Sequence, residues 1–309
     1  MRRKSAENRV YLVWLEWPEK CFRIDNGALA YLKSAVPAGS EVVRAKSRAG
    51  FLRSLSRATH VITWYFEEQW FALAPRLQVL ATPTAGRELV HENAPPGVKV
   101  HFGGFHGRII AESVVGFMMA WSRGFFAERL YPSGEGAMSP RVWLSSRCRT
   151  LAGTKVVIAG YGKIGKSIGA ALKAFSCSVE GISRKNIDRL PEAVKDCSWF
   201  VMALPSTTNT DDFLDAALIR RLPRDCVVIN VGRGNSVDEK ALLAALRSNR
   251  LAGAYLDVAK VEPLKSFRSL ADCDVGQMPP NLVLMPHASA FSPDYLKLCF
   301  KELKDEKLI

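Results

Sequence analysis

The chain contains 309 residues, 48% of them hydrophobic and 24% charged, which is enough for one large or two modest globular domains, each with its own core. No apolar run approaches the roughly 18 residues that a membrane span needs, and the basic start MRRKSAENRV leads into no apolar signal segment, so neither a membrane nor a secreted protein is expected. The formal net charge of +13 comes from basic residues spread along the whole sequence, which favours a solvated basic surface over a nucleic-acid-binding site.

The cysteines indicate a reducing compartment. All seven are scattered, their number is odd and no CxxC pair is present, so neither a disulfide framework nor a metal site is expected. Several lie in apolar runs such as DCVVIN, where a free cysteine packs as a small hydrophobic residue. We therefore expect a cytoplasmic protein without a bound metal.

From Val10 onward, strand-like and helix-like segments alternate, a pattern typical of a parallel sheet covered by helices. Residues 91–107 contain Pro and Gly and are expected to form a loop. Residues 108–126 are expected to form a long apolar helix, and residues 128–150 an irregular connection. The predicted strands of this first part are 10–15, 40–45, 60–66 and 77–84, and the predicted helices 24–36, 48–58 and 69–76.

A second alternating series starts at Thr154, so the predicted fold class is α/β with two Rossmann-like, doubly wound parallel sheets. The last predicted helix, residues 292–306, has no strand of its own in this series and is expected to return to the first unit. The strands of the second series are predicted at 154–160, 178–183, 197–204, 226–232, 252–258 and 281–287, and the helices at 164–175, 213–222 and 239–250.

The segment VVIAGYGKIGKSIG has the G-x-G-x-x-G spacing that is typical of dinucleotide binding, after a predicted strand and at the start of a predicted helix. The first glycine allows the tight turn, the second lets the backbone approach a pyrophosphate, and the third lets helix and strand pack closely. Phosphates would then bind the free N–H groups at the helix N-terminus. The predicted cofactor contacts of this turn are Gly160, Tyr161, Gly162, Lys163, Ile164 and Gly165.

The next predicted strand, SVEGIS, ends where NAD-binding chains carry an acid that contacts the ribose 2′-hydroxyl. Here Ser183, Arg184 and Lys185 stand instead. An acid would repel a 2′-phosphate, whereas a hydroxyl can donate a hydrogen bond to it and two cations can neutralise it. The sequence therefore favours NADP(H), with NAD(H) as the alternative if these residues form only a solvated turn.

Three ionisable residues follow later predicted strands. Arg233 lies between two glycines in INVGRG, Glu262 follows AYLDVAKV, and His287 follows LVLMP. The carboxyl ends of parallel strands share one edge of a sheet, where ligands bind in such folds. Each residue alone has a structural explanation, as a turn residue or a packed histidine, but together they indicate an active site beside the dinucleotide turn.

These residues suit the reduction of a 2-oxo acid. Arg233 would bind the carboxylate with two parallel hydrogen bonds and polarise the carbonyl. A bound nicotinamide would supply hydride. His287 would deliver the proton, while Glu262 orients its ring and stabilises the imidazolium.

From about Leu77 to Leu296 the sequence resembles the D-isomer-specific 2-hydroxyacid dehydrogenases, which include glyoxylate/hydroxypyruvate reductases and D-3-phosphoglycerate dehydrogenases. The resemblance is carried, in the family's order, by IAESVVGFMMAWSR, LAGTKVVIAGYGKIGKSIG, ALPSTTNT, VVINVGRGNSVDEKALLAALRSNRLAGAYLDV, VEPL and MPHASA. It implies an Arg/Glu/His catalytic trio, here Arg233, Glu262 and His287.

The resemblance implies further site residues. Gly86 in ATPTAGREL matches a glycine loop that binds the substrate carboxylate, together with Arg233 and His287, and Asp257 would meet the nicotinamide carboxamide. The loop reads AGREL where many relatives have Gly-Val-Asp, which leaves the identity of the substrate open. The remaining predicted cofactor contacts are Leu204, Pro205, Thr210 and Val231.

The architecture that the resemblance implies has a substrate domain of residues 1–105 and 287–309, a dinucleotide-binding Rossmann domain of residues 106–286, and a cleft between them. It also implies a homodimer. The expected function is NADPH-dependent reduction of a small 2-oxo acid, glyoxylate or hydroxypyruvate, to the D-2-hydroxy acid. The alternative is a nucleotide-sensing, corepressor-like interaction protein with little turnover, which would keep the same trio but usually adds low-complexity tails, and this sequence contains none.

Overall fold

The structure is a computed structural model that describes residues 9–90, 93–132, 138–267, 270 and 278–309. The chain forms two compact units: unit 1 consists of the residues up to His106 together with Phe291–Ile309, and unit 2 of Gly107–Ala290. His287 therefore lies in unit 2, whereas the predicted boundary placed it in the substrate domain. The predicted basic start MRRK, part of the predicted loop (His91 and Glu92) and Cys273 lie outside the described residues.

Unit 1 is built on five parallel strands in the order β2-β1-β3-β4-β5. Every residue of β3 and β4 is buried, as expected for a parallel sheet covered on both faces. The first four strands lie inside their predicted ranges, which confirms those predictions. The strands are β1 (Val10–Trp14), β2 (Glu41–Arg44), β3 (His60–Thr63), β4 (Val79–Thr82) and β5 (Lys99–Phe102).

The prediction was wrong about the fifth strand, because it made residues 91–107 a loop throughout. β5 pairs in parallel with β4, with Val100 opposite Leu80. It has four residues, of which only His101 is buried, and it follows two prolines and a glycine. A short edge strand of this composition gives no periodic signal, since its pairing with β4 holds it in place more than its own side chains do.

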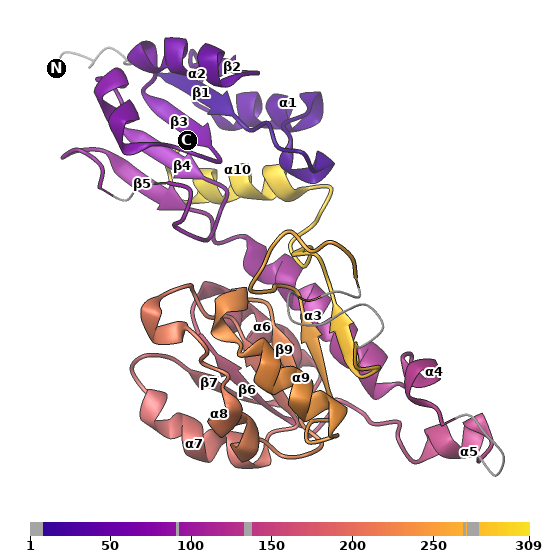
Figure 1. The fold of residues 1–309 in the computed structure, drawn as a ribbon. Coiled ribbons are helices and arrows are strands. Elements are labelled where there is room, and N and C mark those ends of the chain that lie inside the picture. Colours follow the sequence, from indigo (N-terminus) through magenta and orange to yellow (C-terminus); the bar gives the residue numbers. More distant parts are fainter. Residues whose placement is uncertain (1–8, 91–92, 133–137, 268–269, 271–277) are drawn as a thin grey trace. The chain divides into compact units, whose positions relative to one another are not determined.

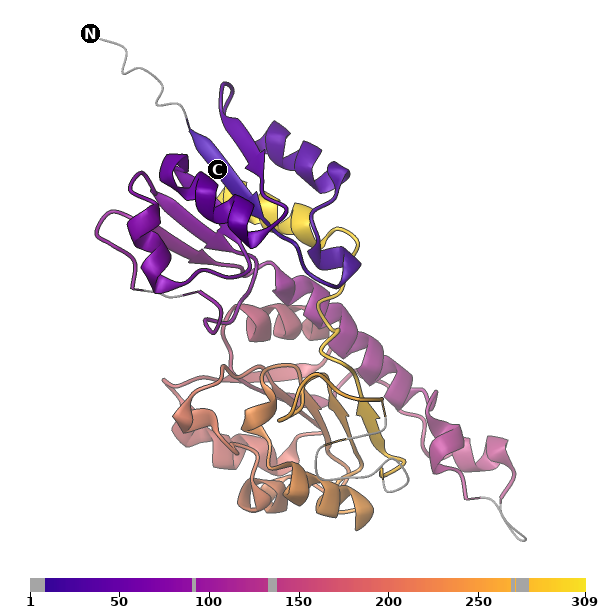
Figure 2. The same ribbon diagram turned by 45° about the horizontal axis from the view of Figure 1, so that its top comes forward.

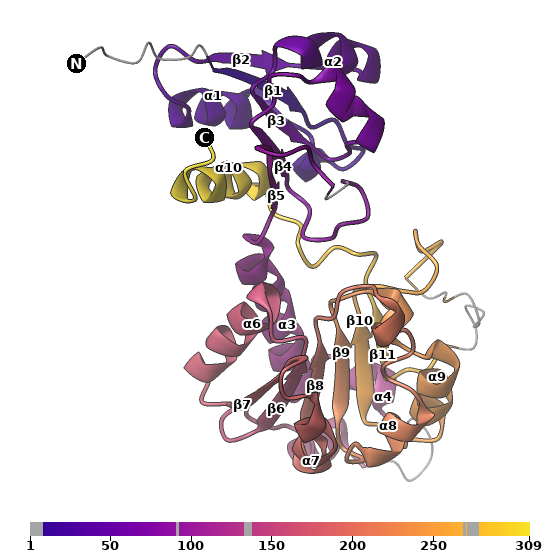
Figure 3. The same ribbon diagram turned by 90° about the vertical axis from the view of Figure 1, so that its left-hand side faces the viewer.

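Helices cover both faces of the unit 1 sheet, with α1 and α10 on one face and α2 on the other (Figures 1 and 3). The C-terminal helix α10 packs against α1 and fully buries Phe300. Its Glu302 accepts a hydrogen bond from the backbone N–H of Gly104 at 2.9 Å and pairs with the ring of His101 at 2.9 Å. These helices are α1 (Asn26–Ala35), α2 (Arg48–Ser54) and α10 (Tyr295–Asp305), while residues 69–76, predicted as an α-helix, belong mostly to the 3₁₀ helix Glu68–Leu73.

Unit 2 is built on six parallel strands in the order β11-β10-β9-β8-β6-β7. Alternate side chains enter two cores, so that Val156 and Ile158 of β6 pack with α3 and α6 while Val157 and Ala159 pack with α7, α8 and α9. Figure 3 shows α3 and α6 on one face of this sheet and α8 and α9 on the other. All six strands were predicted. The strands are β6 (Lys155–Ala159), β7 (Ser178–Ile182), β8 (Trp199–Met202), β9 (Val227–Asn230), β10 (Gly253–Leu256) and β11 (Leu282–Leu284), and the helices α3 (His106–Ser122), α6 (Lys163–Ala174), α7 (Leu190–Ala193), α8 (Ala216–Arg221) and α9 (Glu239–Arg247).

The order of the strands in unit 2 locates its ligand-binding edge. The sheet grows outward from β6 in both directions, to β7 on one side and to β8 on the other. Where the order reverses in this way, open α/β sheets bind ligands in a crevice beyond the carboxyl ends of the strands. The predicted α/β class with two parallel sheets is confirmed, and the glycine-rich turn after β6 lies at the reversal point.

The long helix α3 leads into a segment with two short helices, α4 (Ala127–Leu130) and α5 (Pro140–Ser145), where the sequence predicted an irregular connection. Figures 1 and 2 show this segment beyond the end of α3, away from the sheet of unit 2. Its Trp143 is buried against Tyr131. Within the described residues, neither α3 nor any other helix is both long enough and apolar enough to cross a lipid bilayer.

Replacing Phe300 with Ala should lower the free energy of unfolding by about 3–5 kcal/mol, because the ring is fully buried and its loss leaves a cavity. Urea unfolding followed by tryptophan fluorescence measures the change. The matched control is Lys304→Ala on the exposed side of the same helix, for which we expect a change within about 0.5 kcal/mol. Equal effects of the two substitutions would contradict the burial of α10.

Candidate active site

The turn after β6 has the three glycines where a dinucleotide-binding turn needs them. Gly160 has φ +91° and lies so close to the turn after β8 that a Cβ would be 2.4 Å from the carbonyl oxygen of Ala203. A Cβ on Gly165 would lie 2.4 Å from the carbonyl oxygen of Gly160, so α6 packs directly on the turn. The space beside Gly162 is open. The first and third glycines are therefore required by packing, and the second leaves room for a ligand.

The N-terminus of α6 suits the pyrophosphate of a dinucleotide. Gly162 is the N-cap residue and has no side chain to cap the helix. The first N–H groups of a helix have no acceptor within it and attract anions. Of the other predicted contacts, Ile164 packs partly into the core beneath α6, and the ring of Tyr161 covers Gly181 of β7, where a Cβ would lie 2.3 Å from the ring.

The turn after β7 holds two cations on a hydrogen-bonded frame. Asn186 accepts hydrogen bonds at Oδ1 from the backbone N–H of Ser183 (2.8 Å) and from its hydroxyl (2.9 Å), and its amide donates to the carbonyl of Gly181 (3.0 Å). The side chains of Arg184 and Lys185 are exposed and form no ion pair within the described part of the chain. The Ser183 hydroxyl, predicted to contact the cofactor, thus helps to shape the turn, and Arg184 and Lys185 remain available to an anion.

The other predicted cofactor contacts lie along the same edge. Leu204 and Pro205 follow β8, and the hydroxyl of Thr210 donates to the carbonyl of Pro205 at 2.7 Å. Val231 follows β9, where its N–H donates to the carbonyl of Met202 at 3.0 Å and its side chain is buried. Because its side chain is buried, Val231 could contact a cofactor at this edge only through its backbone.

A buried asparagine, Asn230, holds the turn that carries Arg233 through hydrogen bonds to its backbone. Asn230, the fully buried last residue of β9, donates to the carbonyl of Arg233 at 3.1 Å and accepts from the N–H of Gly232 at 3.0 Å. The hydroxyl of Ser236 donates to the same carbonyl at 2.7 Å. Sequence reasoning missed Asn230, although an Asn at the end of the apolar run CVVIN was a visible signal.

His287 and Glu262 form a hydrogen-bonded pair, with Nδ1 and Oε2 2.9 Å apart and side chains 50% and 33% exposed. This hydrogen bond is the main cause that raises the pKa of His287, to which the charges of Glu262 and Asp257 add. Burial alone would raise the pKa of Glu262, but the hydrogen bond and the charge of His287 outweigh it, so this pKa lies below its ordinary value. The charge of Arg233 lowers both pKa values. Arg233, Glu262 and His287 follow the neighbouring strands β9, β10 and β11, so all three lie at the same edge of the sheet.

Asp257 acts on the backbone around His287. Its Oδ1 accepts from the N–H of Ala288 (2.9 Å) and of Ser289 (3.0 Å), and its carbonyl accepts from the N–H of His287 (2.7 Å). Burial raises the pKa of Asp257, and these amides oppose the rise. His287 has φ +56°, a backbone conformation that residues other than glycine rarely adopt. Asp257 thus holds the strained His287 turn, and its predicted contact with the nicotinamide carboxamide stays a prediction.

Gly86, the predicted substrate loop, lies in unit 1 after β4. The hydroxyl of Thr84 donates to the carbonyl of Gly86 at 3.0 Å, and the N–H of Gly103 donates to the carbonyls of Thr82 (3.0 Å) and Thr84 (2.9 Å). The guanidinium of Arg87 lies over the ring of Phe102 at 5.2 Å. The loop thus has a defined shape at the carboxyl edge of the unit 1 sheet.

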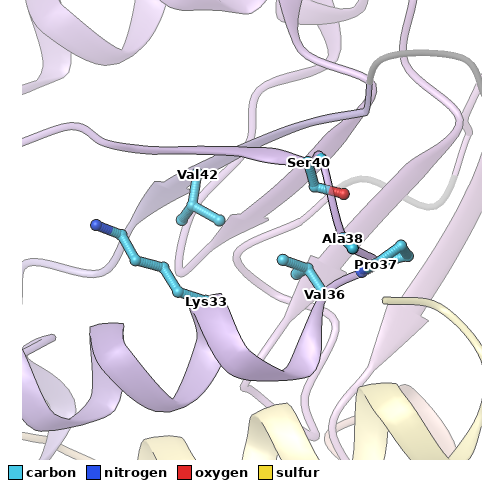
Figure 4. A pocket seen from close by; sticks show the side chains of 7 residues that line it. Lys33, Val36, Pro37, Ala38, Ser40 and Val42 are labelled. Atoms are coloured by element: carbon cyan, nitrogen blue, oxygen red, sulfur yellow. The ribbon is translucent and has the colours of Figure 1, made fainter.

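Two hollows lie away from these edges. One, of about 370 Å³, lies between the end of α1 and β2, and Lys33 is the one ionisable residue that lines it (Figure 4). The other, of about 640 Å³, lies between α3 and α6 and is lined mainly by apolar residues such as Met119 and Phe175. Neither hollow collects an acid–base set comparable to Arg233, Glu262 and His287.

Comparison with known proteins identifies the family. A family model described as D-isomer specific 2-hydroxyacid dehydrogenase, NAD binding domain, matches residues 115–289. A glycerate dehydrogenase of Methylorubrum extorquens is 26% identical over 75% of this chain and 75% of its own length, and a glyoxylate reductase of Korarchaeum cryptofilum is 26% identical over 75% and 72%. An NADPH-dependent glyoxylate/hydroxypyruvate reductase from Sinorhizobium meliloti, solved with NADP and sulfate, has a TM-score of 0.73 at 25% identity, over 97% of this chain and 95% of that one.

The matched range contains the dinucleotide turn as well as Arg233, Glu262 and His287. It covers more than half of the chain. The chain therefore belongs to the D-isomer specific 2-hydroxyacid dehydrogenase family, whose members are NAD(P)-dependent oxidoreductases.

Proposed function

We propose that this dehydrogenase reduces a small 2-oxo acid, glyoxylate or hydroxypyruvate, to the D-2-hydroxy acid with NADPH. The observation that carries the proposal is the hydrogen-bonded His287–Glu262 pair, which lies at the same edge of the sheet as Arg233 and the dinucleotide turn. The names of the relatives support this substrate class, since they include two glyoxylate reductases and a glycerate dehydrogenase.

In the proposed reaction, each residue of the trio has one task. Arg233 binds the substrate carboxylate, and the bound nicotinamide supplies hydride to the carbonyl carbon. Because Nδ1 of His287 faces Glu262, Nε2 is the nitrogen that gives its proton to the developing alkoxide. The carboxylate of Glu262 favours the protonated form of His287 before this step, because it raises the pKa of the ring, and solvent restores the proton afterwards.

The preference for NADPH is proposed from the turn after β7. The acid of that strand, Glu180, is paired with Arg189 at 2.9 Å and with Lys155 at 3.7 Å, so its charge is compensated. The exposed Arg184 and Lys185 would then meet the 2′-phosphate, for which the planar guanidinium is well suited. The homodimer and the cytoplasmic location stay predictions of the family resemblance and of the cysteine content.

Replacing His287 with Asn should lower kcat for glyoxylate or hydroxypyruvate by roughly 10²- to 10⁴-fold, the contribution typical of a general acid. Asn tolerates the positive φ of this position, so the turn should persist. NADPH binding, followed by the fluorescence of the bound cofactor, should change little. Undiminished turnover would exclude His287 as the proton donor, and cofactor binding by the unaltered protein without turnover of any 2-oxo acid would refute the reductase.

Replacing Arg184 with Ala should weaken NADPH binding by roughly 10- to 100-fold, which corresponds to the loss of one hydrogen bond to a charged group. NADH binding should change little, because NADH has no 2′-phosphate. Dissociation constants for both cofactors give the test, with Lys195→Ala, an exposed lysine paired with Glu192, as the matched control. An equal loss for both cofactors would refute the proposed contact.

Replacing Glu262 with Gln should move the falling limb of the kcat/KM profile for reduction to lower pH. Reduction uses the protonated His287, so the rate is highest below the pKa of His287 and falls as the pH rises through it. The hydrogen bond to Glu262 is the main cause that raises this pKa, and the substitution removes the charge behind it. A limb that stays at the same pH would show that Glu262 does not set the protonation of His287.

A further inference from the structure

Glu239 is a buried carboxylate for which the proposed reaction has no use. It begins α9 directly after the N-cap residue Asp238, and 2% of its surface is exposed. Carboxylates are rarely buried unless they have partners. The contacts of Glu239 therefore indicate what keeps it in the interior.

Glu239 holds the backbone of the turn that carries Glu262. Its Oε1 accepts a hydrogen bond at 2.7 Å from the N–H of Lys260. In the same turn, Oε1 of Glu262 accepts from the N–H of Ala259 at 3.1 Å, which leaves Oε2 of Glu262 to face His287. Two successive backbone amides are thus held by two carboxylates, one from α9 and one from the turn itself.

The same turn also packs against the residue that follows Arg233. A Cβ on Gly234 would lie 1.9 Å from the carbonyl oxygen of Ala259 and 2.6 Å from the nitrogen of Lys260. The turn therefore contacts both α9 and the Arg233 turn. A shift of the Lys260 amide away from Glu239 would move Glu262 relative to both Arg233 and His287.

We propose that Glu239 is a positioning residue for the reaction, which holds the Ala259–Glu262 turn so that Glu262 meets His287 beside Arg233. The inference rests on the proposed roles of Glu262 and His287. Removal of the Glu239 carboxylate leaves the amide of Lys260 without this acceptor, and the turn then shifts to find another. Displacements of about 1 Å at such sites are enough to cost roughly 10²-fold in rate.

An exposed ion pair reaches the same turn and provides a matched control. The ammonium of Lys260 pairs with the carboxylate of Asp212, and the two side chains are 35% and 53% exposed. Exposed pairs of this kind contribute little to holding a backbone. Asp212 has φ +47°, which Asn tolerates, so Asp212→Asn removes the charge without strain.

The test compares Glu239→Ala, Glu239→Gln and Asp212→Asn with the unaltered protein. The titration midpoint of the His287 ring is measured by NMR without cofactor or substrate, with His287→Asn to assign the signal. Values of kcat and KM and the NADPH dissociation constant complete the set. Glu239→Ala should lower both the midpoint and kcat, the latter by roughly 10- to 100-fold, with NADPH binding within about twofold. Glu239→Gln should restore both, since its amide oxygen can accept from Lys260, and Asp212→Asn should change neither.

Three outcomes would overturn the proposal. The first is a folded Glu239→Ala protein with an unchanged midpoint and kcat. The second is a loss in Glu239→Gln as large as in Glu239→Ala, which would assign the effect to charge. The third is an equal loss in Asp212→Asn, which would assign it to the exposed pair. If Glu239→Ala does not fold, Glu239→Asp replaces it, because its shorter side chain withdraws the acceptor, and an unchanged Glu239→Asp protein would refute the role.

The two proposals fail separately. Full turnover by His287→Asn would refute the proposed reaction. The titration midpoint of the His287 ring in the Glu239 variants is measured without turnover. It therefore reports the position of Glu262 whatever the substrate is.

Discussion

The turns at the carboxyl edge of the unit 2 sheet touch one another through backbone atoms, and glycines at the points of contact make this possible. A Cβ on Gly160 or Gly232 would lie within 2.6 Å of the backbone after β8, and a Cβ on Gly234 would lie 1.9 Å from the carbonyl oxygen of Ala259. The contacts follow the order of the sheet, from β6 to β8, β9 and β10. Because backbone packs on backbone, no flexible side chain separates the dinucleotide turn from the turn of Glu262. The position of the Glu262 turn relative to the cofactor turn is therefore set by the sheet and by these glycines.

The same edge gives two neighbouring carboxylates opposite properties. Asp257 is buried, so its pKa is raised, and its oxygens accept from the backbone amides that shape the His287 turn. Glu262 is partly exposed and faces the imidazole, so its pKa is lowered. One carboxylate thus acts on the backbone of His287 and the other on its ring. Divergent environments of this kind assign different tasks to chemically similar groups, as they do at many acid–base sites.

Much of this arrangement could be predicted from the sequence, because the strands of unit 2 are apolar runs whose ends are marked by Gly, Arg, Asp or His. From that pattern alone, Arg233, Glu262 and His287 are expected at one edge of the sheet. The pattern could not show β5, whose stability comes from its partner strand. It also missed Asn186 and Asn230, and Glu239 is equally silent in the sequence, since each acts through a hydrogen bond to a backbone group of a turn. Asn186 and Asn230 act within their own turns, where a polar residue next to an apolar strand was the one local signal. The contact of Glu239 joins two segments 21 residues apart, and no single-segment pattern reports it.

The two ends of the candidate site use charge in opposite ways, and their contacts explain why. At the proposed cofactor end, Arg184 and Lys185 are exposed on a turn that Asn186 holds in shape and form no ion pair with any described residue, so an anion could bind them without first breaking one. At the other end, His287 and Glu262 are already paired, which would orient the ring for the proposed proton transfer before the substrate arrives. Cations without an ion-pair partner suit the binding of a ligand that must enter and leave in every cycle. A side chain that is already hydrogen-bonded to a charged partner suits a group that must keep one position while the ligand changes.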